Sequence, residues 1–181
     1  MRYALVYGGI AGAIVISVLV AGLAFDLHSH ATSEWFGYLV MLVALSLIFV
    51  GIKRYRDVEC GGVIRFGRAF GLGLGIAAVA AAVYVTVWEI YLAASGIDFM
   101  AQYTAIVVEG MRGEGATPAE IESKVAEMRE MAEIYRNPLL RIPITFIEIF
   151  PVGLIVALVS AALLRNPRLL PARGESRRAG A

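Results

Sequence analysis

Four long apolar stretches limit what this chain can fold into. They cover residues 3–25, 35–52, 69–88 and 142–164. Each approaches the ~20 residues that a helix needs to cross about 30 Å of hydrocarbon. Hydrophobic residues make up 59% of the chain, more than the ~45–50% usual for soluble domains. We therefore predict an all-α integral membrane protein, with one four-helix domain over residues 1–165 and transmembrane helices at about 3–25, 35–52, 67–94 and 142–164.

Positively charged residues alternate between the loops. Residues 26–34 contain no Lys or Arg, residues 53–68 contain five, and five more follow Leu164. Short basic loops remain cytoplasmic because Lys and Arg are translocated poorly and anionic lipid retains them. This pattern predicts a multi-pass membrane protein with both termini in the cytoplasm. A cleaved signal peptide is the alternative for the first stretch, although the apolar run is longer than the ~7–15 residues of a typical signal.

The segment between the third and fourth stretches, residues 97–136, has helical patterns of its own. The TPAE sequence at residues 117–120 is typical of a capping box with proline at the first helical position. We expect that helix to end near Tyr135, before the Asn-Pro pair at 137–138. Apolar positions within residues 99–107 predict a second helix upstream. This segment either caps the outer end of the bundle or forms a docking surface for an envelope protein partner.

Small residues mark two predicted helix-packing faces. Gly8 and Gly12 lie four residues apart in the first stretch, and Gly67, Gly71 and Gly75 repeat the same spacing at the start of the third. Glycine at this spacing lets helix backbones approach closely in lipid. We expect the first and third helices to pack together within one subunit. The alternative is a homo-oligomer formed through the third-helix stripe.

Two glutamates in or beside the later stretches form a candidate intramembrane polar site. Glu89 and Glu148 are costly to place at membrane depth, and such groups often carry function. Thr145 precedes Glu148 by three residues, on the same helix face. If the two carboxylates face one cavity, they can share a proton and serve a proton- or cation-coupled transporter or channel. The alternative is structural, because Glu89 follows Trp88 and can lie at the level of the lipid headgroups.

Other features give weaker indications. Asp26, His28, His30 and Glu34 form a short acidic-histidine loop, in which metal binding is conceivable but solvated turn residues are the simpler interpretation. Residues 166–181 predict a disordered basic tail against anionic lipid, without the aromatic residues of an RNA-binding platform. No metalloprotease, P-loop or hydrolase motif is present, so we predict no enzyme, cofactor, metal or nucleic-acid partner.

The basic connection between the second and third stretches is the most distinctive motif. Candidate lipid-headgroup contacts are Lys53, Arg54, Arg56, Arg65 and Arg68, and Asp57 can pair with one of them. The consecutive glycines at 61–62 predict a tight turn. The connection acts either as a topology anchor or, through Arg65 and Arg68 near a helix N-terminus, as a site for an anionic ligand.

The sequences GIKRYRD at residues 51–57, GG at 61–62 and FGRAFGLG at 66–73 resemble the central motif of domain-of-unknown-function family 4199. Arg68 stands where that family commonly has lysine. The resemblance implies a four-span bacterial membrane protein with a helical segment outside the membrane before a proline-containing fourth helix, and it implies no activity. We expect a non-catalytic membrane component that binds a protein partner or lipid, with a small transporter using Glu148 and Glu89 as the alternative.

Overall fold

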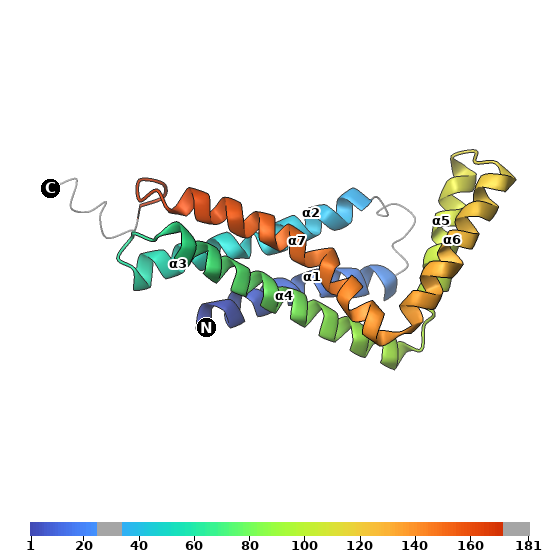
Figure 1. The fold of residues 1–181 in the computed structure, drawn as a ribbon, viewed down its shortest axis with the longest axis horizontal. Coiled ribbons are helices and arrows are strands. Elements are labelled where there is room, and N and C mark those ends of the chain that lie inside the picture. Colours follow the sequence, from blue (N-terminus) through green and yellow to red (C-terminus); the bar gives the residue numbers. More distant parts are fainter. Residues whose placement is uncertain (25–33, 172–181) are drawn as a thin grey trace. The chain divides into compact units, whose positions relative to one another are not determined.

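The computed structural model describes residues 1–24 and 34–171, and in these ranges every regular element is a helix. Figure 1 shows the seven helices: α1 (Arg2–Ala24), α2 (Glu34–Leu45), α3 (Leu47–Glu59), α4 (Phe66–Ser95), α5 (Phe99–Gly113), α6 (Pro118–Arg136) and α7 (Pro138–Leu164). Four helical segments of the described chain are long and apolar enough to cross a membrane: Arg2–Leu23, Gly37–Glu59, Phe66–Ser95 and Pro138–Leu164. The prediction of an all-α membrane protein with four spans is confirmed.

The chain divides into two compact units. The first combines Met1–Val85 with Phe146–Ala181, and the second is Thr86–Thr145. The long helices α4 and α7 each contribute to both units. The first unit therefore contains most of the apolar helices, while the second contains α5, α6 and the adjoining ends of α4 and α7.

In the first unit, glycines bring α1 against α4. A Cβ atom on Gly8 would lie 2.6 Å from the carbonyl oxygen of Ile76, and one on Gly12 would lie 2.5 Å from the carbonyl oxygen of Ala80. Both distances are shorter than real Cβ contacts, so only glycine fits at this helix crossing. The first and third spans pack through these two positions.

The third span uses a different glycine from the expected stripe. A Cβ atom on Gly67 or Gly71 would meet nothing within 4 Å, and one on Gly75 would only touch Ala4 at 3.4 Å. The close approach is at Gly73, where a Cβ would lie 2.8 Å from Cβ of Ala157 on α7. Two residues along a helix correspond to a rotation of about 200°, so Gly73 and Gly71 lie on nearly opposite faces. Most of the Gly67–Gly71–Gly75 stripe thus faces away from the first unit's core.

The second span is broken once and extends further than expected. Helices α2 and α3 meet at Ser46, whose hydroxyl donates to the Val43 carbonyl at 2.6 Å. This local bond competes with regular helical bonding. Helix α3 then continues to Glu59 rather than ending near residue 52, so the first basic residues of the motif lie on its last two turns. The predicted tight turn follows, with φ of +62° at Gly61 and +89° at Gly62.

The helical segment between the third and fourth spans is confirmed as two helices. Thr117 caps α6 through a complete capping box with Glu120, as predicted. Met100 of α5 and Met128 of α6 are the buried residues of the pair. Helix α7 begins at Pro138, four residues before the expected start of the fourth span, so Arg141 lies within its first turns rather than in the preceding loop.

The capping box makes the stability of α6 depend on pH. Hydrogen bonds from the backbone amide and the hydroxyl of Thr117 lower the pKa of Glu120 below its ordinary value. A carboxylate with a lowered folded-state pKa stabilises the fold above its unfolded pKa, and this stabilisation is lost as pH falls through the folded-state pKa. We expect wild-type protein to lose α6 stability on acidification, and Glu120→Gln to lose less, as measured by hydrogen exchange of α6 amides. Equal acid sensitivity in the two proteins would contradict this assignment.

Candidate functional site

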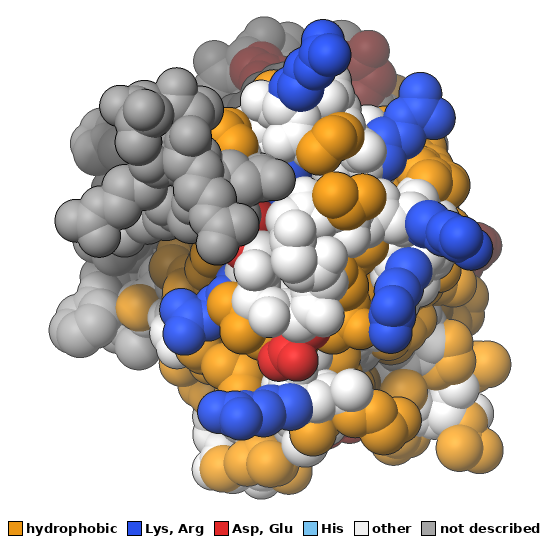
Figure 2. Space-filling model, turned by 90° about the vertical axis from the view of Figure 1, so that its left-hand side faces the viewer, with side chains coloured by type: hydrophobic (Ala, Val, Ile, Leu, Met, Phe, Trp, Pro, Cys, Tyr) orange, Lys and Arg blue, Asp and Glu red, His pale blue; other side chains and the backbone are white. Residues whose placement is uncertain are grey.

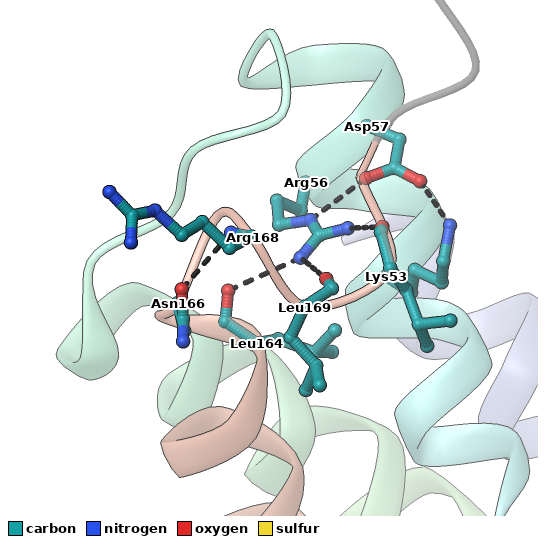
Figure 3. Close-up of polar contacts among 8 residues, drawn as sticks. Lys53, Arg56, Asp57, Leu164, Asn166, Arg168 and Leu169 are labelled. Atoms are coloured by element: carbon teal, nitrogen blue, oxygen red, sulfur yellow. Dashed lines mark hydrogen bonds and ion pairs between the residues drawn. The ribbon is translucent and has the colours of Figure 1, made fainter. Parts of the chain in front are cut away.

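Arg56, predicted to contact lipid headgroups, is instead buried in the protein. Its side chain is fully inaccessible to solvent. Its Nε donates to Asp57 at 2.8 Å, and its Nη1 donates to the carbonyl oxygens of Leu164 and Leu169 at 3.5 and 3.0 Å (Figure 3). Its Nη2 donates to the carbonyl oxygen of Leu170. The headgroup assignment of Arg56 is therefore wrong.

The C-terminal end of α7 explains why an arginine is buried there. The last carbonyls of a helix lack intrahelical partners, and Leu164 is the last residue of α7. The following residues turn back, with Asn166 bonded to Leu163 and Leu169 to Asn166, so that two more carbonyls point at α3. Five donors in a planar fork allow one guanidinium to bond to several of these oxygens at once. Residues 166–170 are thus ordered rather than part of a disordered tail, and residues 172–181 lie outside the described residues.

Lys53 also forms an ion pair within the protein. Its ammonium group pairs with Asp57, which bridges Lys53 and Arg56. The expected pairing of Asp57 with a basic neighbour is confirmed. Glu59, two residues after Asp57, accepts a hydrogen bond from the Tyr3 hydroxyl at 3.0 Å. The acidic groups at the end of α3 are therefore engaged by partners on α1 and α3.

The remaining arginines of the motif are exposed. Figure 2 shows Lys and Arg side chains spread over this end of the first unit, with hydrophobic side chains between them. Five exposed arginines lie in or beside the ends of α3, α4 and α7, and we call this surface the basic end. They are Arg54, Arg65, Arg68, Arg165 and Arg168. The spans that end here are apolar over most of their length, so the basic end lies where apolar helix surface gives way to charged surface.

In the second unit, Glu89 forms an ion pair that the sequence did not reveal. Arg141 donates from Nε and Nη2 to the two carboxylate oxygens of Glu89, the first at 2.7 Å. Side-chain exposure is 23% for Glu89 and 16% for Arg141. Such bidentate pairs are among the stronger hydrogen-bonded contacts in proteins. The Glu89 carboxylate is neutralised by α7 rather than left free at membrane depth.

An aromatic cluster surrounds this ion pair. Trp88 donates from Nε1 to the Tyr135 hydroxyl at 2.7 Å and packs edge-to-face on Phe99, with ring centroids 4.9 Å apart. The Arg141 guanidinium lies over the Tyr135 ring, 5.6 Å from its centroid, and donates to the Tyr135 carbonyl oxygen at 3.2 Å. Residues of α4, α5, α6 and α7 meet here, and Trp88 is buried among them at 2% exposure.

A double-mutant cycle would measure the Glu89–Arg141 pair. We expect Glu89→Gln and Arg141→Gln to couple by about 1–2 kcal/mol, since the pair is bidentate and mostly shielded from water. The Glu133–Arg136 pair on α6 is a matched control, because both side chains are about 70% exposed, and exposed pairs contribute little. Chemical unfolding in detergent gives the free energies. Equal coupling in the two cycles would contradict a special role for Glu89.

Glu148 and Thr145 differ in their surroundings. Glu148 lies on an exposed face of α7 and accepts a hydrogen bond from the Tyr84 side chain of α4. Thr145 is 2% exposed, and its hydroxyl has no hydrogen-bond partner among the described residues. Neither residue shares the ion pair of Glu89. The three residues of the candidate intramembrane site therefore have separate environments.

The candidate metal loop cannot be assessed from the described residues. Asp26, His28 and His30 lie outside them, and Glu34 begins α2. Among the residues that the structure describes, no group of three or more His, Cys, Asp or Glu side chains is placed to hold a metal ion.

Comparison with known proteins gives one match. The model of the family described as "Protein of unknown function (DUF4199)" matches residues 6–166. No curated protein and no solved structure matches the chain. The matched range includes most of the first span, the whole of the other three, and both helices between the third and fourth.

Proposed function

This chain belongs to the DUF4199 family of proteins of unknown function, and we propose that it is a non-catalytic component of the bacterial inner membrane that binds anionic lipid at its basic end. The observation that carries the proposal is the division of the basic residues into two groups. Arg56 and Lys53 are held by Asp57 and by backbone carbonyls, whereas the arginines of the basic end are exposed beside apolar helix surface. Exposed arginines at the end of a span attract anionic headgroups.

The orientation of the protein follows from the same residues. Basic segments stay on the cytoplasmic side, so the basic end and both chain termini are proposed to face the cytoplasm. The α5–α6 pair then lies on the periplasmic side. In this orientation the basic end lies at the leaflet that is rich in anionic lipid. Each Lys or Arg near that surface contributes about 1 kcal/mol to the binding free energy.

Native mass spectrometry of the full-length protein tests the proposal. The protein is released from mixed micelles that contain equal amounts of phosphatidylglycerol and phosphatidylcholine. We expect preferential retention of phosphatidylglycerol, with a preference that falls as salt rises because screening weakens exposed charge contacts. Equal retention of the two lipids would refute the proposal. The same spectra report the oligomeric state, including the homo-oligomer predicted as an alternative.

A protein partner at α5–α6 is the second candidate function. Met131 and Ile134, three residues apart on α6, are 40% and 42% exposed, although they belong to a helix outside the four candidate spans. Met128 is buried, so a substitution there would test folding rather than docking. Loss of a co-purified envelope protein in Met131→Glu/Ile134→Glu, with α6 still folded, would support this candidate.

Transport through the two glutamates has weaker support. The Glu89 carboxylate is already paired with Arg141, and a carboxylate that carries protons or cations must be able to release its partner. Glu148 remains the better candidate. An ion flux in proteoliposomes that Glu148→Gln abolishes would favour transport over a purely binding role.

A further inference from the structure

We propose that a hollow at the start of α4 binds the phosphate of one anionic phospholipid molecule. This inference rests on the proposed function and narrows it from a charged surface to one site. The hollow has a volume of about 670 Å³, within the ~300–1,000 Å³ range of small-molecule sites. It is lined by Cys60, Val63, Ile64, Arg65, Gly67 and Arg68.

Two of the residues that line the hollow are arginines without an acidic partner in the described part of the chain. Neither Arg65 nor Arg68 forms an ion pair there with an acidic side chain. The nearest acidic residues in sequence, Asp57 and Glu59, have partners elsewhere. The Arg68 guanidinium lies over the Tyr55 ring, 5.6 Å from its centroid. Stacking on an aromatic face leaves the edge of a guanidinium free to donate to phosphate oxygens.

The apolar part of the site distinguishes a lipid from a free phosphate. Val63 is 59% exposed although it lines the hollow beside Arg65. The surface of α4 then continues past Gly67 and Gly71, where an added Cβ would meet nothing within 4 Å. An acyl chain lying along this face would cover apolar surface that the protein leaves uncovered. Two cations in the lining of the hollow, with uncovered positions further along α4, match an amphipathic phosphate ester.

The test compares variants that carry equal charge. In one, Arg65→Gln and Arg68→Gln remove two cations at the hollow, and in the matched control, Arg165→Gln and Arg168→Gln remove two cations elsewhere on the basic end. Native mass spectrometry with phosphatidylglycerol measures the affinity of the first retained lipid. We expect at least a roughly tenfold loss in the first variant and less than a threefold loss in the control, since only the first removes direct phosphate contacts.

The possible outcomes separate this inference from the broader proposal. Equal losses in the two variants would overturn the single site while leaving general binding at the basic end intact. No loss in either would overturn both. Displacement of the lipid by millimolar inorganic phosphate would show an anion site without lipid selectivity and would overturn the assignment to lipid.

A second variant tests the hollow without changing its charge. Gly67→Leu places a side chain in the hollow, and the open space at Gly67 predicts that the protein still folds. Ala162→Leu, on an exposed face of α7, is the control. We expect Gly67→Leu to reduce retention of the first lipid at least fivefold and Ala162→Leu to leave it unchanged. Equal retention in Gly67→Leu and wild type would overturn the inference.

Discussion

Replacing Arg56 with methionine is expected to destabilise the folded protein by about 3–5 kcal/mol, the usual cost of removing one member of a buried ion pair. The substitution leaves the carbonyl oxygens of Leu164, Leu169 and Leu170 without their donor. It also leaves Asp57 with Lys53 alone. We expect the turn after α7 to detach from α3, which hydrogen exchange of residues 164–170 would detect together with a lower unfolding midpoint in detergent.

Arg54→Met is the matched control for this prediction. Arg54 lies two residues earlier on the same helix and is exposed, so its removal is expected to change the unfolding free energy by less than about 0.5 kcal/mol. Arg56→Lys keeps the charge but loses the planar fork, and we expect it to recover less than half of the lost stability. Similar stabilities for Arg56→Met and Arg54→Met would show that the buried network contributes little.

Substituting alanine for Gly12 is expected to destabilise the protein by about 1–3 kcal/mol, the usual cost of overpacking a well-packed contact. The added methyl group would lie 2.5 Å from the backbone oxygen of Ala80 and 3.1 Å from its Cα. A backbone atom cannot rotate away as a side chain can, so α1 and α4 must separate. The unfolding free energy in detergent measures the effect.

Gly9 is the control for Gly12, because a Cβ atom there would meet nothing within 4 Å. Both glycines lie on α1, and both changes add one methyl group. We expect Gly9→Ala to be neutral. Alanine has the higher helix propensity and would by itself stabilise α1, so a destabilisation equal to that of Gly12→Ala would contradict the α1–α4 contact as its cause. Gly71→Ile should likewise leave the monomer folded, since Gly71 faces open space.

Several features were predictable because they depend on short stretches of sequence. The spans follow from the length of the apolar runs, which any membrane-spanning helix must satisfy. The start of α6 follows from the Thr117 capping box, which bonds residues only three apart. The turn at Gly61 and Gly62 follows from the positive φ values that glycine adopts without strain.

Predictions about side-chain environment were less successful because hydropathy does not identify partners. Arg56 and Arg54 lie two residues apart in the same basic motif, yet one is buried and the other exposed. The difference depends on carbonyl groups more than 100 residues away in sequence, at the end of α7. Glu89 likewise finds its partner, Arg141, 52 residues later. One sequence feature could have indicated that Arg141 lies on a helix. It follows the Asn137-Pro138 pair by three residues, and proline is common at the start of a helix.

The sequence by itself determined that this is an all-α membrane protein of four spans, because the energetic cost of exposing backbone and polar groups to hydrocarbon acts on each segment separately. It also determined the chain's family. Only the tertiary structure decided which glycines lie at helix crossings, Gly73 rather than Gly71, and which arginines remain exposed. Those choices depend on the rotation of each helix against its neighbours and on the unsatisfied carbonyls at helix ends, which become defined only when distant segments pack together.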